Sequence, residues 1–239
     1  MDLLASLNPE QQDAVLQAEG ALLILAGAGS GKTRVIAHRI AHLVSSQIAP
    51  PDCILAVTFT NKAAEEMRTR VATLLGVNCQ QMWISTFHAL CARLLRREAP
   101  HIGLSRDFVI YDSTDQLTIM KQALRQLGVD DSTLPPRLAL SRISHAKNRM
   151  EEPHTFAANA LHARDQQIGT LYGLYLKALR DANALDFDDL LLRTVELFER
   201  TDSVRERYSE KFRFVMVDEY QDTNRPQYLL VQHLAGRHR

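Results

Sequence analysis

Apolar residues gather in four short segments that predict the strands of one buried parallel sheet. Each segment is apolar, and most of them end in a small or polar residue. Helix-like spacing follows the first three directly, as the crossover connections of a parallel sheet require. The segments are residues 22–26 (LLILA), 54–58 (ILAVT), 82–86 (MWIST) and 214–218 (FVMVD). The pattern therefore predicts an α/β fold with helices flanking the sheet.

The clearest helical pattern covers residues 61–75, where apolar side chains recur on one face. The residues of that face are Ala63, Ala64, Met67, Val71 and Leu74. Asn61 is predicted to cap the start of this helix, and Gly76 is predicted to end it.

A long stretch separates the third and fourth predicted strands. It contains roughly 125 residues, whereas a simple crossover needs about a dozen. Residues 117–127 and 168–179 have helical apolar spacing, and Pro135, Pro136 and Pro153 are expected to break helices. We therefore expect a mostly helical subdomain to be inserted there.

The composition is that of a globular protein and leaves its partner open. The 239 residues are 46% hydrophobic and 23% charged, which excludes a disordered or fibrous chain. Because 28 Lys and Arg balance 28 Asp and Glu, a polyanion would have to bind a local basic patch. Three cysteines without metal-ligand spacing argue against a disulfide framework and a zinc site. No signal-like segment opens the chain and no apolar stretch approaches the roughly 18 residues of a membrane span, so we expect a cytoplasmic protein.

A glycine-rich segment, AGAGSGKT, follows the first predicted strand and precedes a helical pattern. This order of strand, turn and helix is typical of a phosphate-binding loop, in which backbone amides and the helix start face phosphate oxygens. Lys32 is predicted to neutralise the β and γ phosphates, and Thr33 to coordinate Mg²⁺. Since Ala26 stands where the strict pattern has glycine, the alternative is a glycine-rich surface turn. The candidate nucleotide-binding residues here are Ala26, Gly27, Ala28, Gly29, Ser30, Gly31, Lys32, Thr33 and Arg34.

An acidic pair, Asp218 and Glu219, comes at the end of the fourth predicted strand. Ligands of open parallel sheets bind at the carboxyl ends of the strands, so this pair is expected near the phosphate-binding loop. Asp218 is predicted to hold Mg²⁺, and Glu219 to deprotonate the attacking water. The alternative is a solvated helix start, where acidic side chains are favoured by the helix dipole. The loop and the acidic pair together predict a nucleoside triphosphatase.

Four segments then carry a family resemblance: LNPEQQDAV (7–15), TFTNKAAEEMRTRV (58–71), STFHAL (85–90) and VDEYQDTN (217–224). They resemble the Q motif and motifs Ia, Ib and II of the UvrD, PcrA and Rep group of superfamily 1 DNA helicases, and the similarity covers essentially the whole chain. The resemblance implies that Gln11 reads the adenine edge and selects ATP. It also implies that Asp218 is the metal ligand, Glu219 the catalytic base, and Gln221 a link from the nucleotide site to DNA. Without the resemblance, residues 7–15 would be read as an amphipathic helix start.

In that family the loops of motifs Ia and Ib grip single-stranded DNA, so the resemblance implies DNA contacts in this chain. Aromatic rings stack on bases of any sequence, and polar side chains bond the sugar-phosphate backbone. The candidate DNA-binding residues are Phe59, Thr60, Asn61, Thr86, Phe87 and His88. The alternatives are core packing for the two phenylalanines and a helix-cap hydrogen bond for His88.

The inserted subdomain would, by the same resemblance, lean over the duplex ahead of the fork. Candidates for phosphate contacts there are Arg137, Arg142, Lys147 and Arg149, with a solvated surface as the alternative. The acidic residues of LDFDDLL, residues 185–191, are interpreted as caps of a helix start.

The resemblance implies a RecA-like ATP-binding domain formed by residues 1–90 and 185–239, with the inserted helical subdomain at 91–184. It implies Mg²⁺-dependent ATP hydrolysis that drives 3′ to 5′ translocation on single-stranded DNA, with duplex junctions and DNA-repair proteins as partners. Motif III and a second RecA-like domain would follow in the family, so we expect this N-terminal part to bind Mg-ATP without unwinding DNA. Two alternatives stay open: the helicase module of a RecB- or AddA-type recombination nuclease, and a non-catalytic ATP-binding module.

Overall fold

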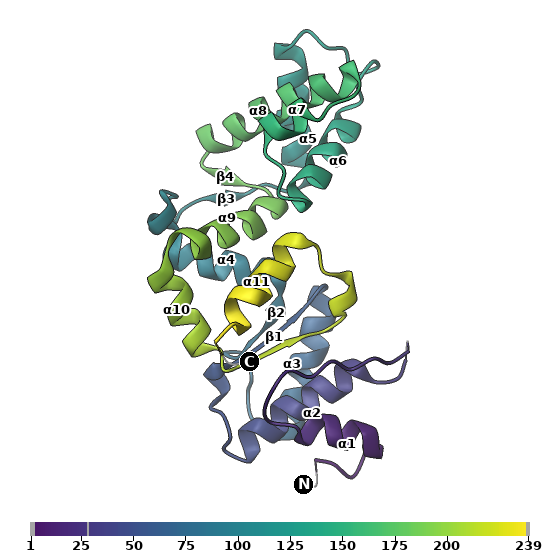
Figure 1. The fold of residues 1–239 in the computed structure, drawn as a ribbon, viewed down its shortest axis with the longest axis vertical. Helices are drawn as coiled ribbons and strands as arrows, with labels where there is room; N and C mark the ends of the chain where they lie inside the picture. The colour runs from purple at the N-terminus through teal and green to yellow at the C-terminus, as the bar shows by residue number, and fades with distance from the viewer. Residues whose placement is uncertain (1–2, 28, 238–239) are drawn as a thin grey trace. The chain divides into compact units, whose positions relative to one another are not determined.

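The computed structural model describes residues 3–27 and 29–237, and the chain divides into two compact units (Figure 1). The first unit comprises Met1–Leu90, Asp202–Thr223 and Val231–Arg239. The second unit comprises Cys91–Thr201 and Asn224–Leu230. Helices α4 (Phe87–Glu98) and α11 (Arg225–Ala235) each include a point where the chain passes from one unit to the other.

The first unit is built on a parallel sheet with the strand order β2-β1-β5. Its strands are β1 (Ile54–Thr58), β2 (Trp83–Thr86) and β5 (Phe214–Val217). The central strand β1 is buried along its whole length, as expected for a strand with neighbours on both sides. Three predicted strands are thus confirmed to within one residue at each end, and with them the α/β class.

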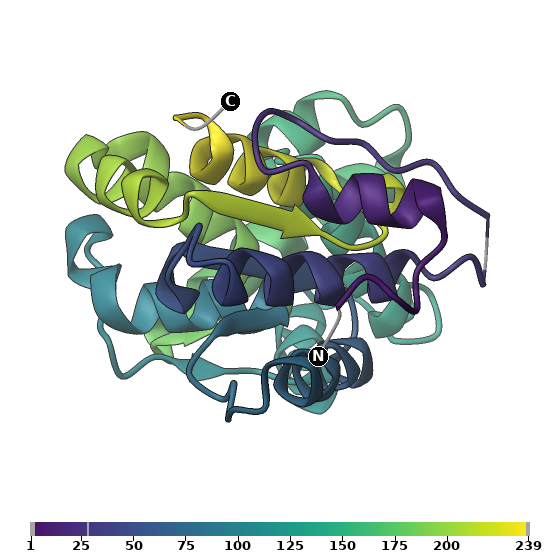
Figure 2. The same cartoon turned by 90° about the horizontal axis from the view of Figure 1, so that it is seen from below.

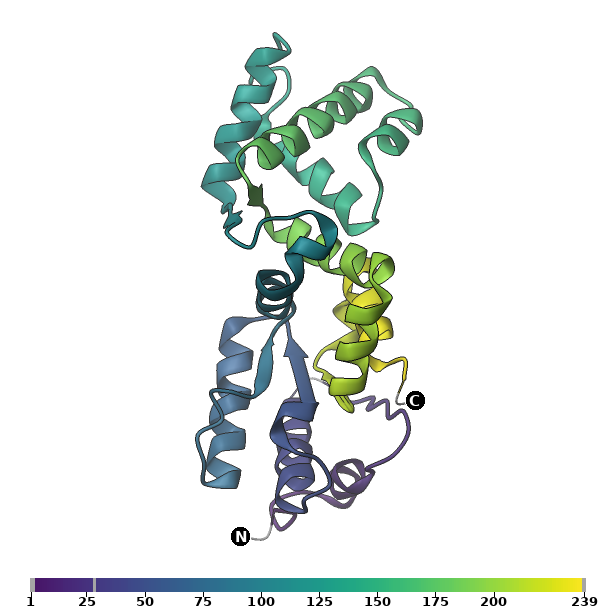
Figure 3. The ribbon, with the colours of Figure 1, turned by 90° about the vertical axis from the view of Figure 1, so that its left-hand side faces the viewer.

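Two helices, α2 (Lys32–Ser45) and α3 (Asn61–Leu75), pack on one face of this sheet. Ile40 of α2 and Met67 of α3 share a core with Ala56 of β1, and Figure 3 shows α3 beside β1 and β2. Helix α1 (Pro9–Leu16) lies along α2 (Figure 2). The unit also contains α10 (Asp202–Lys211) and the short 3₁₀ helices η1 (Pro51–Cys53) and η3 (Tyr220–Asp222).

Helix α3 confirms the predicted pattern but not the predicted cap. Ala64, Met67 and Val71 are buried. The N-cap is Thr60, whose Oγ1 accepts a hydrogen bond from the Ala63 amide at 3.1 Å, so the assignment of the cap to Asn61 is wrong by one residue. A capping residue keeps an extended backbone, whereas Asn61 is already helical. Gly76 ends the helix in the left-handed conformation, as predicted (φ 68°).

The predicted first strand, residues 22–26, is wrong. Residues 21–27 have no regular secondary structure, and the side chains of Leu23 and Leu25 are 68% and 86% exposed. Ile24 packs partly against the small apolar cluster of α1 and α2. A strand is stabilised by hydrogen bonds to a neighbour, and within the described residues no strand pairs with this segment. The apolar run predicted burial of side chains and could not supply that partner.

The second unit is mostly helical. It contains η2 (Ala99–Ile102), α5 (Ser113–Gln126), α6 (Pro136–Asn148), α7 (Pro153–Ala158), α8 (Ala163–Asp181) and α9 (Phe187–Arg200), with a short parallel pair formed by β3 (Val109–Ile110) and β4 (Ala184–Leu185). Met120 of α5, Ile143 of α6 and Leu171 of α8 meet in one core. Pro136 and Pro153 begin helices instead of breaking them, because the first helical position needs no amide donor.

None of the helices in the described ranges combines the length and the apolar character needed to cross a bilayer.

Candidate active site

The glycine-rich loop leads directly into α2, and two of its glycines have a backbone that other residues rarely adopt. Gly29 and Gly31 have φ values of 75° and 88°. A Cβ on Gly31 would also lie 3.2 Å from Nε2 of Gln11, so this position favours glycine on two counts. Gly31 is the N-cap of α2 and offers no side-chain cap, which leaves the first amides of the helix open to an anion. Ala28, a predicted nucleotide-binding residue, lies outside the described residues.

Lys32, the first residue of α2, folds back over the loop. Its Nζ donates to the carbonyl oxygens of Ala26 and Gly27, each at 3.3 Å. The same ammonium lies 3.8 Å from Oε1 of Glu219. The structure thus brings together the loop lysine and the strand-end carboxylate, which are far apart in the sequence.

Thr33 and Asp218 make the closest link between loop and strand end. The Thr33 hydroxyl donates to Oδ2 of Asp218 at 2.9 Å. Asp218 is only 3% exposed, and its amide donates to the carbonyl of Val57, which continues the β1–β5 ladder. The other carboxylate oxygen, Oδ1, is buried with no hydrogen-bond partner among the described atoms. A buried, unpartnered carboxylate oxygen beside a hydroxyl is the kind of oxygen ligand set that suits Mg²⁺.

Glu219 has a backbone conformation that is uncommon for a residue with a side chain. Its φ of 51° and ψ of 46° are left-handed, and such residues cluster at functional sites. Gln221 donates from Nε2 to Oε2 of Glu219 at 2.6 Å. The Glu219 side chain remains 40% exposed, so water can reach its carboxylate.

Gln11 joins α1 to the loop. Its Nε2 donates to the carbonyl of Ser30 at 3.0 Å, while its Oε1 accepts from the Asn8 amide at 3.1 Å. Asn8 in turn caps α1, and Pro9 takes the first helical position. Arg34 points elsewhere: its Nη2 donates to the carbonyl of Ser6 at 2.6 Å, an N-terminal anchor in place of a phosphate contact.

Two side chains of α2 that hold the N-terminal segment and α1 were not identified from the sequence. Nη1 of Arg39 donates to the carbonyl of Ala14 at 2.7 Å, and Nδ1 of His38 lies 2.8 Å from the carbonyl of Leu3. Both side chains are buried, and burial lowers the pKa of Arg39. They lie on the buried stretch of α2, so two polar side chains inside an apolar helical face were the signal that the sequence offered.

The candidate DNA-binding residues lie at the carboxyl ends of the neighbouring strands β1 and β2. Thr60 and Asn61 are exposed. Phe87 is 1% exposed and its ring centroid lies 5.6 Å from that of Phe59, so core packing describes Phe87 in this conformation. Thr86 is buried and accepts a hydrogen bond from the Ala89 amide at 3.2 Å, which occupies it in the first turn of α4. His88, the second residue of α4, is half-buried.

In the second unit, the interpretation of Lys147 as a phosphate contact is wrong. Lys147 is 1% exposed, and its Nζ lies 2.7 Å from both Oδ2 of Asp186 and Oδ1 of Asp189. Lys147 follows the buried Ile143 by four residues, and this spacing could have indicated that the lysine lies on the inner face of α6. The predicted cap is confirmed, because Asp186 and Asp189 form a reciprocal capping box at the start of α9.

Two more of the basic candidates already have acidic partners. Arg142 lies 2.8 Å from Asp165, and Arg149 lies 2.5 Å from Glu151. Both pairs are on the surface, where an ion pair contributes little and can exchange for another anion. Arg137 is exposed.

A glycine-rich loop at a helix start, bonded to a carboxylate at the end of a parallel strand, defines the class of P-loop α/β proteins. Comparison with known proteins narrows the class. The family model described as UvrD/REP helicase N-terminal domain matches residues 7–239. The chain therefore belongs to the UvrD/REP helicase N-terminal domain family.

Several curated relatives are similar to the chain along nearly its whole length. ATP-dependent DNA helicase PcrA from Bacillus subtilis (strain 168) is 49% identical over 235 residues, which are 98% of this chain and 32% of that protein. The proteins of the same name from Staphylococcus epidermidis (strain ATCC 12228 / FDA PCI 1200) and Staphylococcus aureus (strain NCTC 8325 / PS 47) are each 47% identical, with the same coverage. The chain spans about a third of the length of the curated relatives it matches.

Proposed function

We propose that this chain binds and hydrolyses ATP with Mg²⁺, as the N-terminal, ATP-binding part of a DNA helicase. The relatives named above are ATP-dependent DNA helicases. The observation that carries the proposal is the hydrogen bond from Thr33 to Asp218, which joins the loop to the strand-end carboxylate across 185 positions of the sequence.

Phosphate binding is proposed for the loop, residues 26–31, together with Lys32 and Thr33. The open amides at the start of α2 supply hydrogen-bond donors, and Lys32 exchanges its two carbonyl partners for phosphate oxygens. Thr33 Oγ1 and the Asp218 carboxylate are the proposed ligands of Mg²⁺. Mg²⁺, when bound, neutralises charge on the phosphates.

Hydrolysis is proposed to use Glu219 as the base. Its carboxylate is accessible to water, and the hydrogen bond from Gln221 holds Oε2, so that Oε1 is the oxygen left to accept the proton. Lys32 lies on the Oε1 side, where it orients that oxygen toward the phosphate site. Gln11 is proposed to read the adenine, because it already contacts the loop through Ser30.

DNA binding is proposed for the loops that follow β1 and β2, through Phe59, Thr60, Asn61, Thr86 and His88, with Phe87 supporting the Phe59 ring from the core. In a protein of the relatives' length, hydrolysis would drive 3′ to 5′ movement on single-stranded DNA toward duplex junctions, with DNA-repair proteins as further partners. Residues 1–90 and 185–239 are proposed as the RecA-like domain, and 91–184 as the inserted subdomain. The change of unit after Leu90 supports the first of these limits.

Titration of the chain with Mg-ATP, followed by single-turnover hydrolysis, tests the proposal. We expect Lys32→Ala to abolish binding, and Glu219→Gln to keep binding while removing hydrolysis. Lys177→Ala is the matched control, because Lys177 lies on the surface of the second unit and pairs with Asp181, four residues later in the same helix. The proposal fails if the unchanged chain does not bind Mg-ATP. Binding without any hydrolysis, the same in the unchanged chain and in Glu219→Gln, would instead identify a non-catalytic ATP-binding module.

A further inference from the structure

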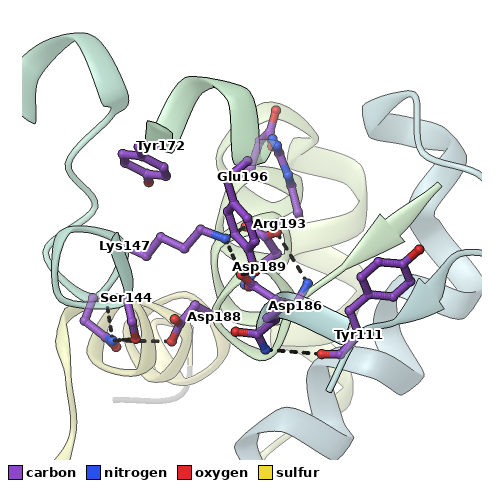
Figure 4. A network of polar contacts seen from close by, with 12 residues as sticks. Tyr111, Ser144, Lys147, Tyr172, Asp186, Asp188, Asp189, Arg193 and Glu196 are labelled. Carbon is purple, nitrogen blue, oxygen red and sulfur yellow. Dashed lines mark hydrogen bonds and ion pairs between the residues drawn. The ribbon is translucent and has the colours of Figure 1, made fainter. Parts of the chain in front are cut away.

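A buried polar cluster joins three helices of the second unit (Figure 4). Lys147 at the end of α6 points toward Asp186 and Asp189 at the start of α9, and the hydroxyl of Tyr175 from α8 donates to Oδ2 of Asp186 at 2.9 Å. A buried ammonium needs such partners, because removing either side leaves an uncompensated charge in the core. The cluster therefore holds the last turn of α6 in one position against α9.

Asn148, the next residue along α6, extends the cluster toward the surface. Its Nδ2 donates to the carbonyl of Ser144 at 2.8 Å and to Oδ1 of Asp188 at 3.3 Å. These two bonds orient the carboxamide so that its Oδ1 accepts a hydrogen bond from Nδ2 of Asn224. Residues 148 and 224 are 76 positions apart in the sequence, and both belong to the second unit.

Asn224 uses both ends of its side chain. Its Oδ1 accepts from the Gln227 amide at 3.0 Å, and its own amide donates to Oε1 of Gln227 at 3.0 Å, so the two residues form a reciprocal cap at the start of α11. A serine or aspartate would cap the helix as well as asparagine does. Only a side-chain amide can cap with its oxygen and also donate from its nitrogen to Asn148.

The hydrogen bond between Asn148 and Asn224 can affect the candidate active site because of where Asn224 lies in the chain. Asn224 directly follows the segment 218–223, which carries Asp218 and Glu219. That segment closes on itself through the bonds from the Asp222 amide to the Glu219 carbonyl and from the Thr223 amide to the Tyr220 carbonyl. Its N-terminal side is held by β5, and the residue after its C-terminal side is held by Asn148.

We propose that Asn148 and Asn224 are positioning residues for ATP hydrolysis. The hydrogen bond between their side chains fixes the C-terminal end of the segment that carries two carboxylates, the proposed metal ligand Asp218 and the proposed base Glu219. This inference rests on the proposed function of that segment. Neither residue is a catalytic group. Their role is to keep Glu219 in its left-handed conformation at the end of β5.

Two variants cut the same bond from opposite sides. Asn224→Asp keeps the cap of α11 and loses the donor, whereas Asn148→Ala loses the acceptor. We expect each to leave the dissociation constant of Mg-ATP unchanged, to lower the single-turnover hydrolysis rate about tenfold, and to speed hydrogen exchange of the amides of residues 219–223 by a similar factor. The double variant should be no worse than either single variant, because both remove one interaction.

Asn159→Ala is the matched control, since Asn159 is a surface asparagine of the second unit whose Nδ2 donates to Glu151. It should change neither rate. Asn224→Ser, which also caps, replaces Asn224→Asp if the aspartate variant does not fold.

The positioning role is overturned if the exchange of residues 219–223 is unchanged, if exchange speeds up while hydrolysis is unchanged, or if the effects of the two variants simply add. Failure of the proposed function looks different, because the unchanged chain itself would then either not bind Mg-ATP or bind it without hydrolysis. The exchange comparison needs no nucleotide, so it judges the Asn148–Asn224 bond by itself.

Discussion

Two adjacent residues of this chain have features that lower the stability of the fold and are uncommon in a packed core. Asp218 buries a carboxylate oxygen without a hydrogen-bond partner, and the adjacent Glu219 has a left-handed backbone. Each feature costs on the order of 1–3 kcal/mol, and such costs gather where the chemistry requires them. Their occurrence on two successive residues beside the glycine-rich loop is not explained by stability, and it supports the proposed function of this site.

The residues most easily inferred from the sequence are those whose chemistry is local. Lys32, Thr33, Asp218 and Glu219 were expected together because a loop at a helix start and a strand-end acid meet at one edge of a parallel sheet, and the hydrogen bond from Thr33 to Asp218 joins the two segments. The burial of Lys147 was not predicted. Its partners Asp186 and Asp189 lie 39 and 42 positions away in the sequence, and a lysine by its residue type alone is expected on the surface.

Replacing Lys147 by methionine should destabilise the protein strongly. The methionine keeps the length of the side chain but leaves Asp186 and Asp189 buried without their cation, which costs about 3 kcal/mol or more. Urea denaturation measures the change in the free energy of unfolding. Arg142→Met, which breaks a surface pair, should cost less than about 1 kcal/mol. Equal costs for the two variants would contradict the assignment of Lys147 to the core.

At the scale of elements, sequence periodicity predicted helices better than it predicted the sheet. Helix α3 covers the predicted residues and ends at the predicted glycine, although its cap lies one residue earlier than predicted, because its apolar period and its terminal glycine are local signals. The segment 22–26 has an equally apolar sequence but is not a strand, because strand formation depends on a neighbour that the segment itself does not encode.

The cap of α3 offers a direct test of its N-terminal boundary. Thr60→Ala removes the hydroxyl that accepts from the Ala63 amide and should lower the free energy of unfolding by about 1 kcal/mol. Asn61→Ala, one residue later, removes no capping bond and should leave stability nearly unchanged or slightly raised, since alanine favours the helix. Chemical denaturation of both variants decides between the two residues, and a larger loss for Asn61→Ala would restore it as the cap.

The buried cluster also predicts how stability depends on pH. Burial alone lowers the pKa of Lys147, but the charges of Asp189 and Asp186 outweigh it and raise the pKa above its usual value. Burial raises the pKa of Tyr175, and Asp186 adds to the effect. Because two carboxylates share one ammonium, the excess negative charge favours the protonated form of both groups.

Raised pKa values of basic and phenolic groups mean that the folded chain keeps protons which the unfolded chain loses. The stabilisation is fully present below about pH 10 and falls as the pH rises above it. Urea denaturation between pH 8 and 11 should show this loss, and it should be smaller in Lys147→Met and in Tyr175→Phe. A slope that is identical in the unchanged chain and in both variants would show that other groups cause the alkaline loss.

At the scale of the whole molecule, the chain combines an α/β unit with a mostly helical unit, and the sequence indicated both kinds of structure. The pattern of apolar residues did not predict which segments belong to which unit, because residues 224–230 belong to the helical unit although they follow the last strand in sequence. The place of this short segment in the helical unit depends on contacts between residues far apart in the sequence, such as the one between Asn148 and Asn224. The periodicity of apolar residues along the chain does not indicate such long-range contacts.

The glycine-rich loop and the strand-end carboxylate are proposed to form one site for a nucleotide and its metal. Calorimetric titration with ATP, with and without Mg²⁺, tests this proposal most directly in the unchanged chain and in Asp218→Asn, with Asp181→Asn as a surface control. We expect Mg²⁺ to tighten ATP binding by about tenfold or more in the unchanged chain and in the control, and Asp218→Asn to lose this gain. An equal gain in Asp218→Asn, or none in the unchanged chain, would contradict it.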